Sequence, residues 1–309
     1  MSIQVVFQQM LVIFLLIAIG YFIYKKGFVG EDASRTFSWL VVNVTNPAVI
    51  ISSVLDADPI SDLGVLAWDM LITLLIYAAS ILLGVLIPWL LRAPKKERGF
   101  YHAMTVYPNS GFMGIPVISA VLGNQAMIFV VIYNILFNLF FYSHGMYVLT
   151  PSEGGKRHLH IDWKQIMNIG TVFSLIALAI CIFRIKLPAV LSETVSYTGR
   201  ATTLLAMLVL GMALARIPFR EIFSDLRLLV YSLIRLLVIP LAAGLILRQV
   251  TDQTLFVQCM VMLLAMPGAN LPLMYCQQEN IRADVLAKGI TLTTLLSLVT
   301  ITLVSVVIA

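Results

Sequence analysis

The chain of 309 residues is 60% hydrophobic and only 11% charged, and its mean hydropathy is +0.97. A water-soluble domain of this length needs far more charged surface, so the composition excludes that class and indicates a membrane protein. The formal net charge of +5 does not indicate nucleic-acid binding, because the basic residues lie in short connectors between long apolar runs.

Ten apolar runs are long enough to be membrane-spanning helices, since a helix crosses the hydrocarbon core in roughly 20 residues. In chain order the predicted helices are 4–24, 36–55, 66–91, 99–122, 126–149, 166–183, 194–215, 226–247, 255–278 and 284–308. We therefore expect an all-α polytopic membrane protein with a first half at 1–150, a cytoplasmic linker at 151–165 and a second half at 166–309. The first run lacks a preceding basic region, which favours a membrane span over a cleaved signal peptide.

The basic residues of the connectors are divided unequally between the two sides of the predicted bundle. Fifteen lie in alternate connectors, namely Lys25, Lys26, Arg35, Arg92, Lys95, Lys96, Arg98, Lys156, Arg157, Lys164, Arg216, Arg220, Arg227, Arg282 and Lys288. Four lie on the other side, namely Arg184, Lys186, Arg200 and Arg248. The side richer in Lys and Arg stays in the cytoplasm. The sequence therefore predicts an inner (plasma) membrane protein with both termini outside.

Turn-forming residues interrupt the fourth and the ninth predicted helix. A shift of 156 residues superposes Gly111 on Pro267 and Pro116 on Pro272, so each break falls at the same point of a five-helix half. Five is odd, so the second half enters the bilayer in the opposite orientation. This pattern is typical of two inverted repeats whose broken helices 4 and 9 cross at the membrane centre. The residues expected to break the helices are Pro108, Gly114, Pro116, Pro267, Gly268 and Pro272.

Broken helices at the membrane centre indicate a binding site. Proline lacks an N–H group and glycine permits a turn, so unpaired backbone groups are exposed there, which a membrane tolerates only around a protein-lined cavity. In the predicted orientation the second half of each helix begins near the membrane centre with its partly positive N-terminus, and two such ends favour an anion. We expect Asn270 to cap one second half and Gly114 to take the matching place in the other. A pair of ordinary proline kinks is the alternative.

The first break also resembles a known family. Residues 109–116, followed by Val121-Leu122-Gly123, resemble the N-x-G-x-x-G-x-P pattern of the auxin efflux carrier family. That family includes bacterial organic-acid carriers and is related to the plant PIN carriers and to the bile acid:sodium symporter superfamily. Residues 197–215, 267–272 and 291–297 are similar to its later spans.

The resemblance implies a homodimeric secondary transporter for a small organic anion, such as malate, malonate or an auxin-like indole acid. It implies an elevator mechanism, in which helices 1, 2, 6 and 7 form a scaffold and helices 3–5 and 8–10 form a transport domain. The chain departs from PIN carriers at Thr73, where they have a Lys four residues after the position of Asp69, and it lacks their long cytoplasmic loop. A membrane receptor or sensor for a small carboxylate on the same fold is the alternative.

Polar side chains within the apolar helices are candidate substrate ligands, because they normally face the protein interior. Interhelical hydrogen bonding without substrate contact is the alternative for each of them. In carriers of the family that the chain resembles, substrate-contacting side chains lie at the positions of Tyr133 and Asn138. The full candidate set is Asn109, Ser110, Gly111, Asn138, Asn270, Tyr133, Asn134, Asn43 and Asn46.

Two charged residues lie within predicted spans. Asp69 is a candidate carrier of a coupling proton, although a wet position at the outer end of its helix is the favoured interpretation. Arg235 is a candidate for balancing a bound carboxylate, and snorkelling to the cytoplasmic face is favoured. The crossover offers Asn109, Ser110 and Asn270 but no carboxylate, so we expect transport that does not require sodium.

No pattern of an enzyme, a nucleotide site or a metal site is found in the sequence. His158 and His160 alternate in a polar loop near His144 without further ligands, and the three cysteines have no metal or redox spacing. We therefore expect no catalytic residue, no metal and no cofactor. The expected partners are a small organic anion, the lipid bilayer and a second copy of the chain.

Overall fold

The structure is a computed structural model that describes residues 3–55, 63–150, 169–216, 218, 222–279 and 281–308. Within these ranges the secondary structure is helical and contains no strand. In the described part of the chain, seven helices are long and apolar enough to cross a membrane, and three further apolar helices are shorter, namely Ser110–Leu122, Ile169–Ile180 and Thr254–Ala265. The chain is therefore a multi-pass helical membrane protein. The predicted linker at 151–165 lies outside the described residues.

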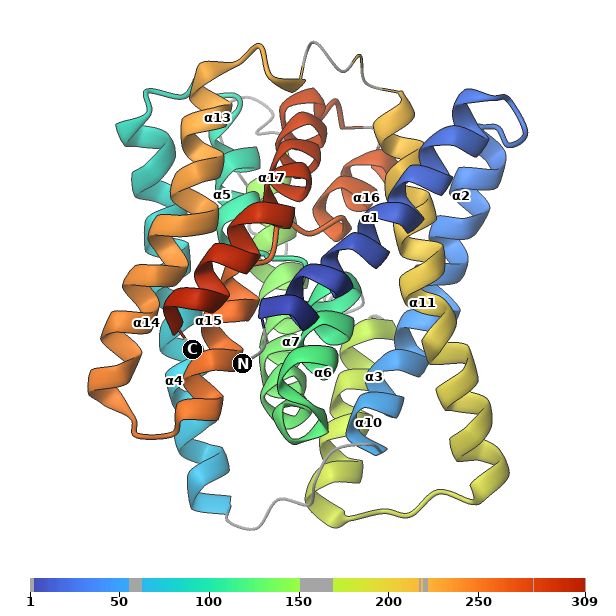
Figure 1. The fold of residues 1–309 in the computed structure, drawn as a ribbon, viewed down its shortest axis with the longest axis vertical. Helices are drawn as coiled ribbons and strands as arrows, with labels where there is room; N and C mark the ends of the chain where they lie inside the picture. The colour runs from blue at the N-terminus through green and yellow to red at the C-terminus, as the bar shows by residue number, and fades with distance from the viewer. Residues whose placement is uncertain are drawn as a thin grey trace.

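In the first half of the chain, successive spans run antiparallel to one another, and α2, η1 and α3 together form one of them (Figure 1). Their bounds are α1 Ile3–Lys25, α2 Glu31–Leu40, η1 Val41–Thr45, α3 Asn46–Leu55, α4 Leu63–Leu90, α5 Arg98–Val106, η2 Ser110–Gly114, α6 Ile115–Leu122, α7 Met127–Phe140, η4 Phe141–Gly145 and α8 Met146–Leu149. The segments η1 and η4 are π-helical turns inside longer helices, and η2 is a π-helical turn that begins the helix Ser110–Leu122. Such turns are found frequently at functional sites.

The second half has a similar course. Its helices are α10 Ile169–Phe183, α11 Ala189–Ala215, α13 Leu226–Leu233, η6 Ile234–Val238, α14 Ile239–Val250, α15 Thr254–Ala265, α16 Leu271–Gln278 and α17 Asp284–Ile308. Another π-helical turn, η6, joins α13 to α14. The connectors α1–α2, α4–α5 and α16–α17 lie at one end of the molecule, and α6–α7, α10–α11 and α14–α15 lie at the other (Figure 1).

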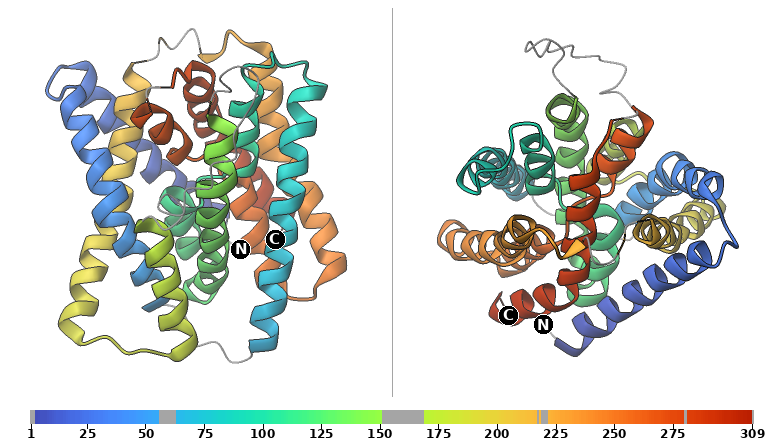
Figure 2. Two further views of the ribbon diagram at one scale, coloured as in Figure 1. Left: turned by 180° about the vertical axis from the view of Figure 1, so that it is seen from behind. Right: turned by 90° about the horizontal axis from the view of Figure 1, so that it is seen from above.

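The helices form two packed groups. In one, α1 and α3 pack against α11, and α3 also packs against α10; in the other, α4 packs on α5, and α15 packs on α14 and α17. Seen from above, the first group lies to one side of the molecule and the second to the other (Figure 2). Helix α7 contacts both groups, because it packs on α3 and α10 as well as on α4 and α15.

Two glycines allow α1 and α11 to approach closely. A Cβ atom on Gly20 would lie 2.3 Å from the Leu208 carbonyl oxygen, and one on Gly211 would lie 2.1 Å from the Ile17 carbonyl oxygen. In lipid there is no hydrophobic driving force between helices, so they associate mainly through van der Waals packing. Small residues such as glycine permit the close backbone approach that this packing requires. The first packed group is therefore held by direct contact of two helix backbones.

We expect Gly20→Ala to lower the thermal unfolding temperature of the detergent-solubilised protein, because the added methyl group forces α1 away from α11 at a cost of about 1–3 kcal/mol. Gly30→Ala is the matched control, since no atom lies within 4 Å of a Cβ atom at Gly30. Unfolding curves measured by intrinsic fluorescence test this. Equal unfolding temperatures for the two variants would contradict the close α1–α11 packing.

Candidate functional site

Two helices stop inside the bundle and resume a few residues later. Helix α5 ends before the gap 107–109, after which η2 and α6 continue, and α15 ends before the gap 266–270, after which α16 continues. The two gaps lie against each other and form an isolated antiparallel bridge between Pro108 and Gly268. The interruptions are therefore in direct contact, although 159 residues separate Pro108 from Pro267, the proline of the second gap.

The gaps satisfy each other's backbone groups. The Asn109 N–H donates to the Pro267 carbonyl at 2.8 Å, and the Ala269 N–H donates to the Tyr107 carbonyl at 2.9 Å. On the other side of the second gap, the Gly268 N–H donates to the Thr293 hydroxyl oxygen at 3.2 Å. Such pairing is what allows irregular backbone inside a membrane protein, where unpaired polar groups cost several kcal/mol.

The gaps do not contain all the residues that the sequence suggested. Pro108, Pro267 and Gly268 lie within them. Gly114 and Pro116 lie inside the continuous helix Ser110–Leu122, and Pro272 is in the first turn of α16, so these three do not form the gaps. The predicted shift of 156 residues pairs Pro116 with Pro272, which both lie in the helices that follow the gaps. The prolines of the gaps themselves, Pro108 and Pro267, are 159 positions apart.

The capping of the second halves also differs from the expectation. Gly114 has helical backbone angles and caps nothing; instead the Asn109 side-chain oxygen accepts a hydrogen bond from the Phe112 N–H at 3.2 Å. The asparagine side chain carries an acceptor that can satisfy one of the first N–H groups of a helix, and glycine has no side chain to do so. The Asn270 carbonyl accepts from the Met274 N–H, so Asn270 stands at the N-cap position of α16, but its side chain makes no cap.

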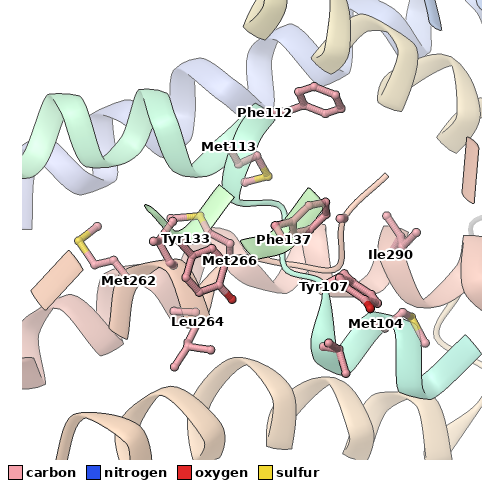
Figure 3. Packing of buried hydrophobic residues seen from close by; sticks show 14 of the residues in the cluster. Met104, Tyr107, Phe112, Met113, Tyr133, Phe137, Met262, Leu264, Met266 and Ile290 are labelled. Atoms are coloured by element: carbon pink, nitrogen blue, oxygen red, sulfur yellow. The ribbon is translucent and has the colours of Figure 1, made fainter. Parts of the chain in front are cut away.

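Apolar side chains surround the crossover of the two helices. Tyr107 stacks edge-to-face on Phe137 with ring centroids 5.5 Å apart, and Met104, Leu264 and Met266 are buried in the same cluster. Figure 3 shows these side chains gathered around the two gaps. In such surroundings hydrogen bonds and charges act at low dielectric, where an unpaired polar group is costly.

A cavity of about 40 Å³ adjoins the gaps. Its walls come from η1 and α3, from η2, from α7, from the start of α10 and from the start of α16. The lining residues that the structure describes include no Asp, Glu, Lys, Arg or His. The apolar part includes Val42, Ile50, Phe112, Phe137 and Tyr142. The sequence-predicted site residues that line it are Asn46, Asn109, Ser110, Gly111, Asn134, Asn138 and Asn270.

Two of these asparagines have hydrogen-bonding atoms without a partner in the part of the chain that the structure describes. Asn270 is 4% exposed and neither its side-chain nitrogen nor its oxygen is bonded; Asn109 is 2% exposed and its side-chain nitrogen is unbonded. A buried polar group left in this state costs about 1–3 kcal/mol, and such cases are uncommon in folded proteins. Both side chains lie on the cavity wall, where these atoms are placed to bond a molecule that enters the cavity.

The other polar lining residues have protein partners. The Ser110 hydroxyl donates to the Asn134 side-chain oxygen at 2.7 Å, which ties η2 to α7. The Asn138 side-chain nitrogen donates to the Ser174 hydroxyl oxygen at 2.9 Å, which ties α7 to α10. These bonds fix the walls of the cavity and bring in Ser174, which sequence reasoning missed because serine is common in membrane helices.

Asn43 and Tyr133 do not line the cavity. The Asn43 side chain donates to the Trp39 carbonyl of its own helix at 3.0 Å, and Tyr133 is buried against Tyr77 with ring centroids 4.8 Å apart. The sequence placed them in the right helices but not on the right face. The apolar lining residues were missed as well, because nothing in sequence distinguishes them from other apolar residues of the same spans.

The two intramembrane charges are both buried, and the favoured interpretation of each was wrong. Asp69 is 2% exposed and accepts a hydrogen bond at 3.0 Å from the side chain of Gln253, which lies in the α14–α15 connector. Arg235 is 0% exposed and donates to the carbonyls of Met104 and Leu264, so it does not snorkel. Neither residue lines the cavity.

Among the described residues, no group of three or more His, Cys, Asp or Glu side chains is placed to hold a metal ion. His158 and His160 lie outside those residues. His144 accepts or donates a hydrogen bond with the Tyr107 hydroxyl at 2.9 Å. The geometry of the site is therefore that of amide groups and helix ends around a small cavity.

Comparison with known proteins adds independent information. A family model described as "membrane transport protein" matches residues 5–305. A protein of Methanothermobacter thermautotrophicus named "uncharacterized transporter" is 28% identical over 312 residues, which covers 97% of each chain. The "uncharacterized transporter YfdV" of Escherichia coli K12 is 23% identical over 291 residues, which covers 88% of each chain.

Proposed function

The chain belongs to the membrane transport proteins of the auxin efflux carrier family, and on this basis we propose that it is a secondary transporter for a small organic anion. One observation carries the choice of an anion: the unpaired side-chain nitrogens of Asn109 and Asn270 are buried at one cavity. Amide N–H groups donate to carboxylate oxygens, and the N-termini of the two resumed helices add partial positive charge.

The size of the cavity favours small substrates. Pockets for drug-sized ligands have volumes of roughly 300–1,000 Å³, whereas this cavity has about 40 Å³. Among the candidates, malonate and malate fit this space better than an auxin-like indole acid, which requires a wider opening. Among the described residues of the lining there is no carboxylate for a sodium ion, which supports transport without a sodium requirement.

An elevator mechanism between two inverted five-span repeats is part of the same proposal. The helices α1, α2–α3, α10 and α11 act as the scaffold, and α4–α8 and α13–α17 act as the transport domain of each copy in a homodimer. The position of the cavity supports this division, because Asn46 of α3 lies on one wall and Asn109, Asn134 and Asn270 lie on the other. A substrate carried there moves along the scaffold when the transport domain slides.

Counterflow in proteoliposomes tests the function. We expect liposomes loaded with unlabelled malonate or malate to accumulate the labelled acid transiently, because a carrier exchanges substrate across the membrane. Thermal-shift assays with malonate, malate and indole-3-acetate identify which acid to use. Binding without exchange would identify a receptor or sensor on the same fold, and absence of binding by every acid tested would overturn the anion assignment.

The orientation is tested by labelling single cysteines. Within a variant whose Cys181, Cys259 and Cys276 are replaced by serine, we expect cysteines at Ser2 and Ala309 to react with an impermeant maleimide in intact cells. We expect a cysteine at Ser152 to react only after permeabilisation, because its connector is among those rich in Lys and Arg. Termini on opposite sides of the membrane would rule out the inverted-repeat arrangement.

A further inference from the structure

Arg235 is a fully buried cation whose hydrogen bonds all go to main-chain carbonyls. It lies in the π-helical turn η6 and is 0% exposed. Its Nε donates to the Met104 carbonyl at 3.0 Å, and its Nη1 donates to the Leu264 carbonyl. Met104 is in the last turn of α5 and Leu264 is in the last turn of α15. One guanidinium therefore joins the C-terminal ends of the two helices that precede the gaps.

The two gaps release these two carbonyls. In a continuous helix the Met104 carbonyl would accept from residue 108, but Pro108 has no N–H group. The Leu264 carbonyl would accept from Gly268, whose N–H donates instead to the Thr293 hydroxyl. The Met104 and Leu264 carbonyls are thus both buried without their helical donors, and the planar fork of Arg235 supplies a donor to both.

The charge of Arg235 is balanced without a carboxylate. Within the described residues the ion pairs are Arg216–Glu31 and Arg282–Asp284, and neither includes Arg235. A helix C-terminus carries roughly half a negative charge, so the ends of α5 and α15 together offset one guanidinium. The Arg235 Nη2 has no hydrogen-bond partner in this part of the chain, so carbonyls alone hold the group.

We propose that Arg235 is the positioning residue of the crossover and that it sets the preference of the adjacent cavity for anions. The negative ends of α5 and α15 would repel an anion at the crossover. Arg235 cancels them, and the positive ends of the resumed helices remain uncompensated on the side of the cavity. The positioning role rests on the hydrogen bonds alone, whereas the anion preference rests on the proposed function.

Three variants separate the two roles. Arg235→Gln removes the charge and keeps a donor, and Arg235→Lys keeps the charge but loses the planar fork. Arg248→Gln is the matched control, because Arg248 lies in the adjoining helix α14 and also donates to a helix-end carbonyl, that of Ile308, at 3.0 Å. Hydrogen exchange of the amides of Asn109 and Ala269 reports the crossover pairing, and malonate titration of the purified protein reports the anion site.

We expect Arg235→Gln to bind malonate about tenfold more weakly, Arg235→Lys to bind within about threefold of wild type, and Arg248→Gln to bind as wild type does. We expect both Arg235 variants, but not the control, to exchange the two amides at least about tenfold faster. If Arg235→Gln does not fold, the amide exchange of Arg235→Lys decides the positioning role. The charge role is then decided by comparing the malonate affinity of Arg235→Met with that of Arg235→Lys.

The results distinguish the possible failures. Exchange in the Arg235 variants equal to that of the control overturns the positioning role. Equal malonate affinity in the charged and uncharged variants overturns the charge role. If wild type binds none of malonate, malate and indole-3-acetate, the proposed function fails, and the exchange measurement still decides whether Arg235 positions the crossover.

Discussion

Asn270→Ala is expected to weaken carboxylate binding about tenfold or more while the fold stays intact. The side chain is buried at the cavity with no partner for either polar atom in the described part of the chain, so a bound carboxylate gains one or two hydrogen bonds there. Each is worth about 1 kcal/mol, and more when the acceptor is charged. Because an unpaired buried amide is removed, the unfolding temperature without ligand should equal or exceed that of wild type.

Asn109→Ala should weaken binding similarly, with one difference that the structure specifies. Its side-chain oxygen accepts from the Phe112 N–H, so this variant also loses a helix cap worth about 1 kcal/mol and should unfold at a lower temperature. Asn43→Ala is the control, since Asn43 bonds within its own helix and does not line the cavity. Calorimetric titration and thermal unfolding measure both effects.

The asparagine assignment fails if both alanine variants bind the carboxylate as wild type does. The substrate contacts would then have to move to Asn134 and Asn138 on α7. The crossover would keep only a mechanical role.

Pro108→Ala is expected to lower the transport rate at least about tenfold with a smaller change in affinity. Proline inside a helix costs about 3 kcal/mol, so alanine removes the block that ends α5. Extension of α5 through 107–109 would break the two hydrogen bonds that join the gaps, which are worth about 1 kcal/mol each. Alanine therefore lowers the cost of a closed, helical form by about the proline penalty, and the site would spend more time in that form.

Pro272→Ala is the matched control, because Pro272 is the second residue of α16, where a helix has no partner for the missing N–H. Initial rates of counterflow at saturating substrate should fall for Pro108→Ala and stay near wild type for Pro272→Ala. Wild-type rates in both variants would show that the proline of the first gap does not control the crossover. A similar loss in both would mean that the resumed helices, not the gaps, limit the rate.

Features that depend on local composition could be predicted from the sequence alone. Long apolar runs identify a helical membrane protein, since a helix is the structure in which a single segment satisfies its own backbone groups in lipid. Proline and glycine marked the two interrupted helices to within a few residues, because they act on the backbone where they stand. The resemblance around residues 109–116 led to the family to which the chain belongs.

Which side chains meet became known only from the folded structure. The bonds from Arg235 to Met104 and Leu264, the pairing of the gap at 107–109 with the gap at 266–270, and the burial of Asp69 under Gln253 all join distant parts of the chain. The structure also removed Asn43 and Tyr133 from the cavity and placed the break before Gly114 and Pro116. Hydropathy reports only that a residue is in the membrane, whereas the partner of a buried polar group depends on helix rotation and on contacts across more than a hundred residues of chain.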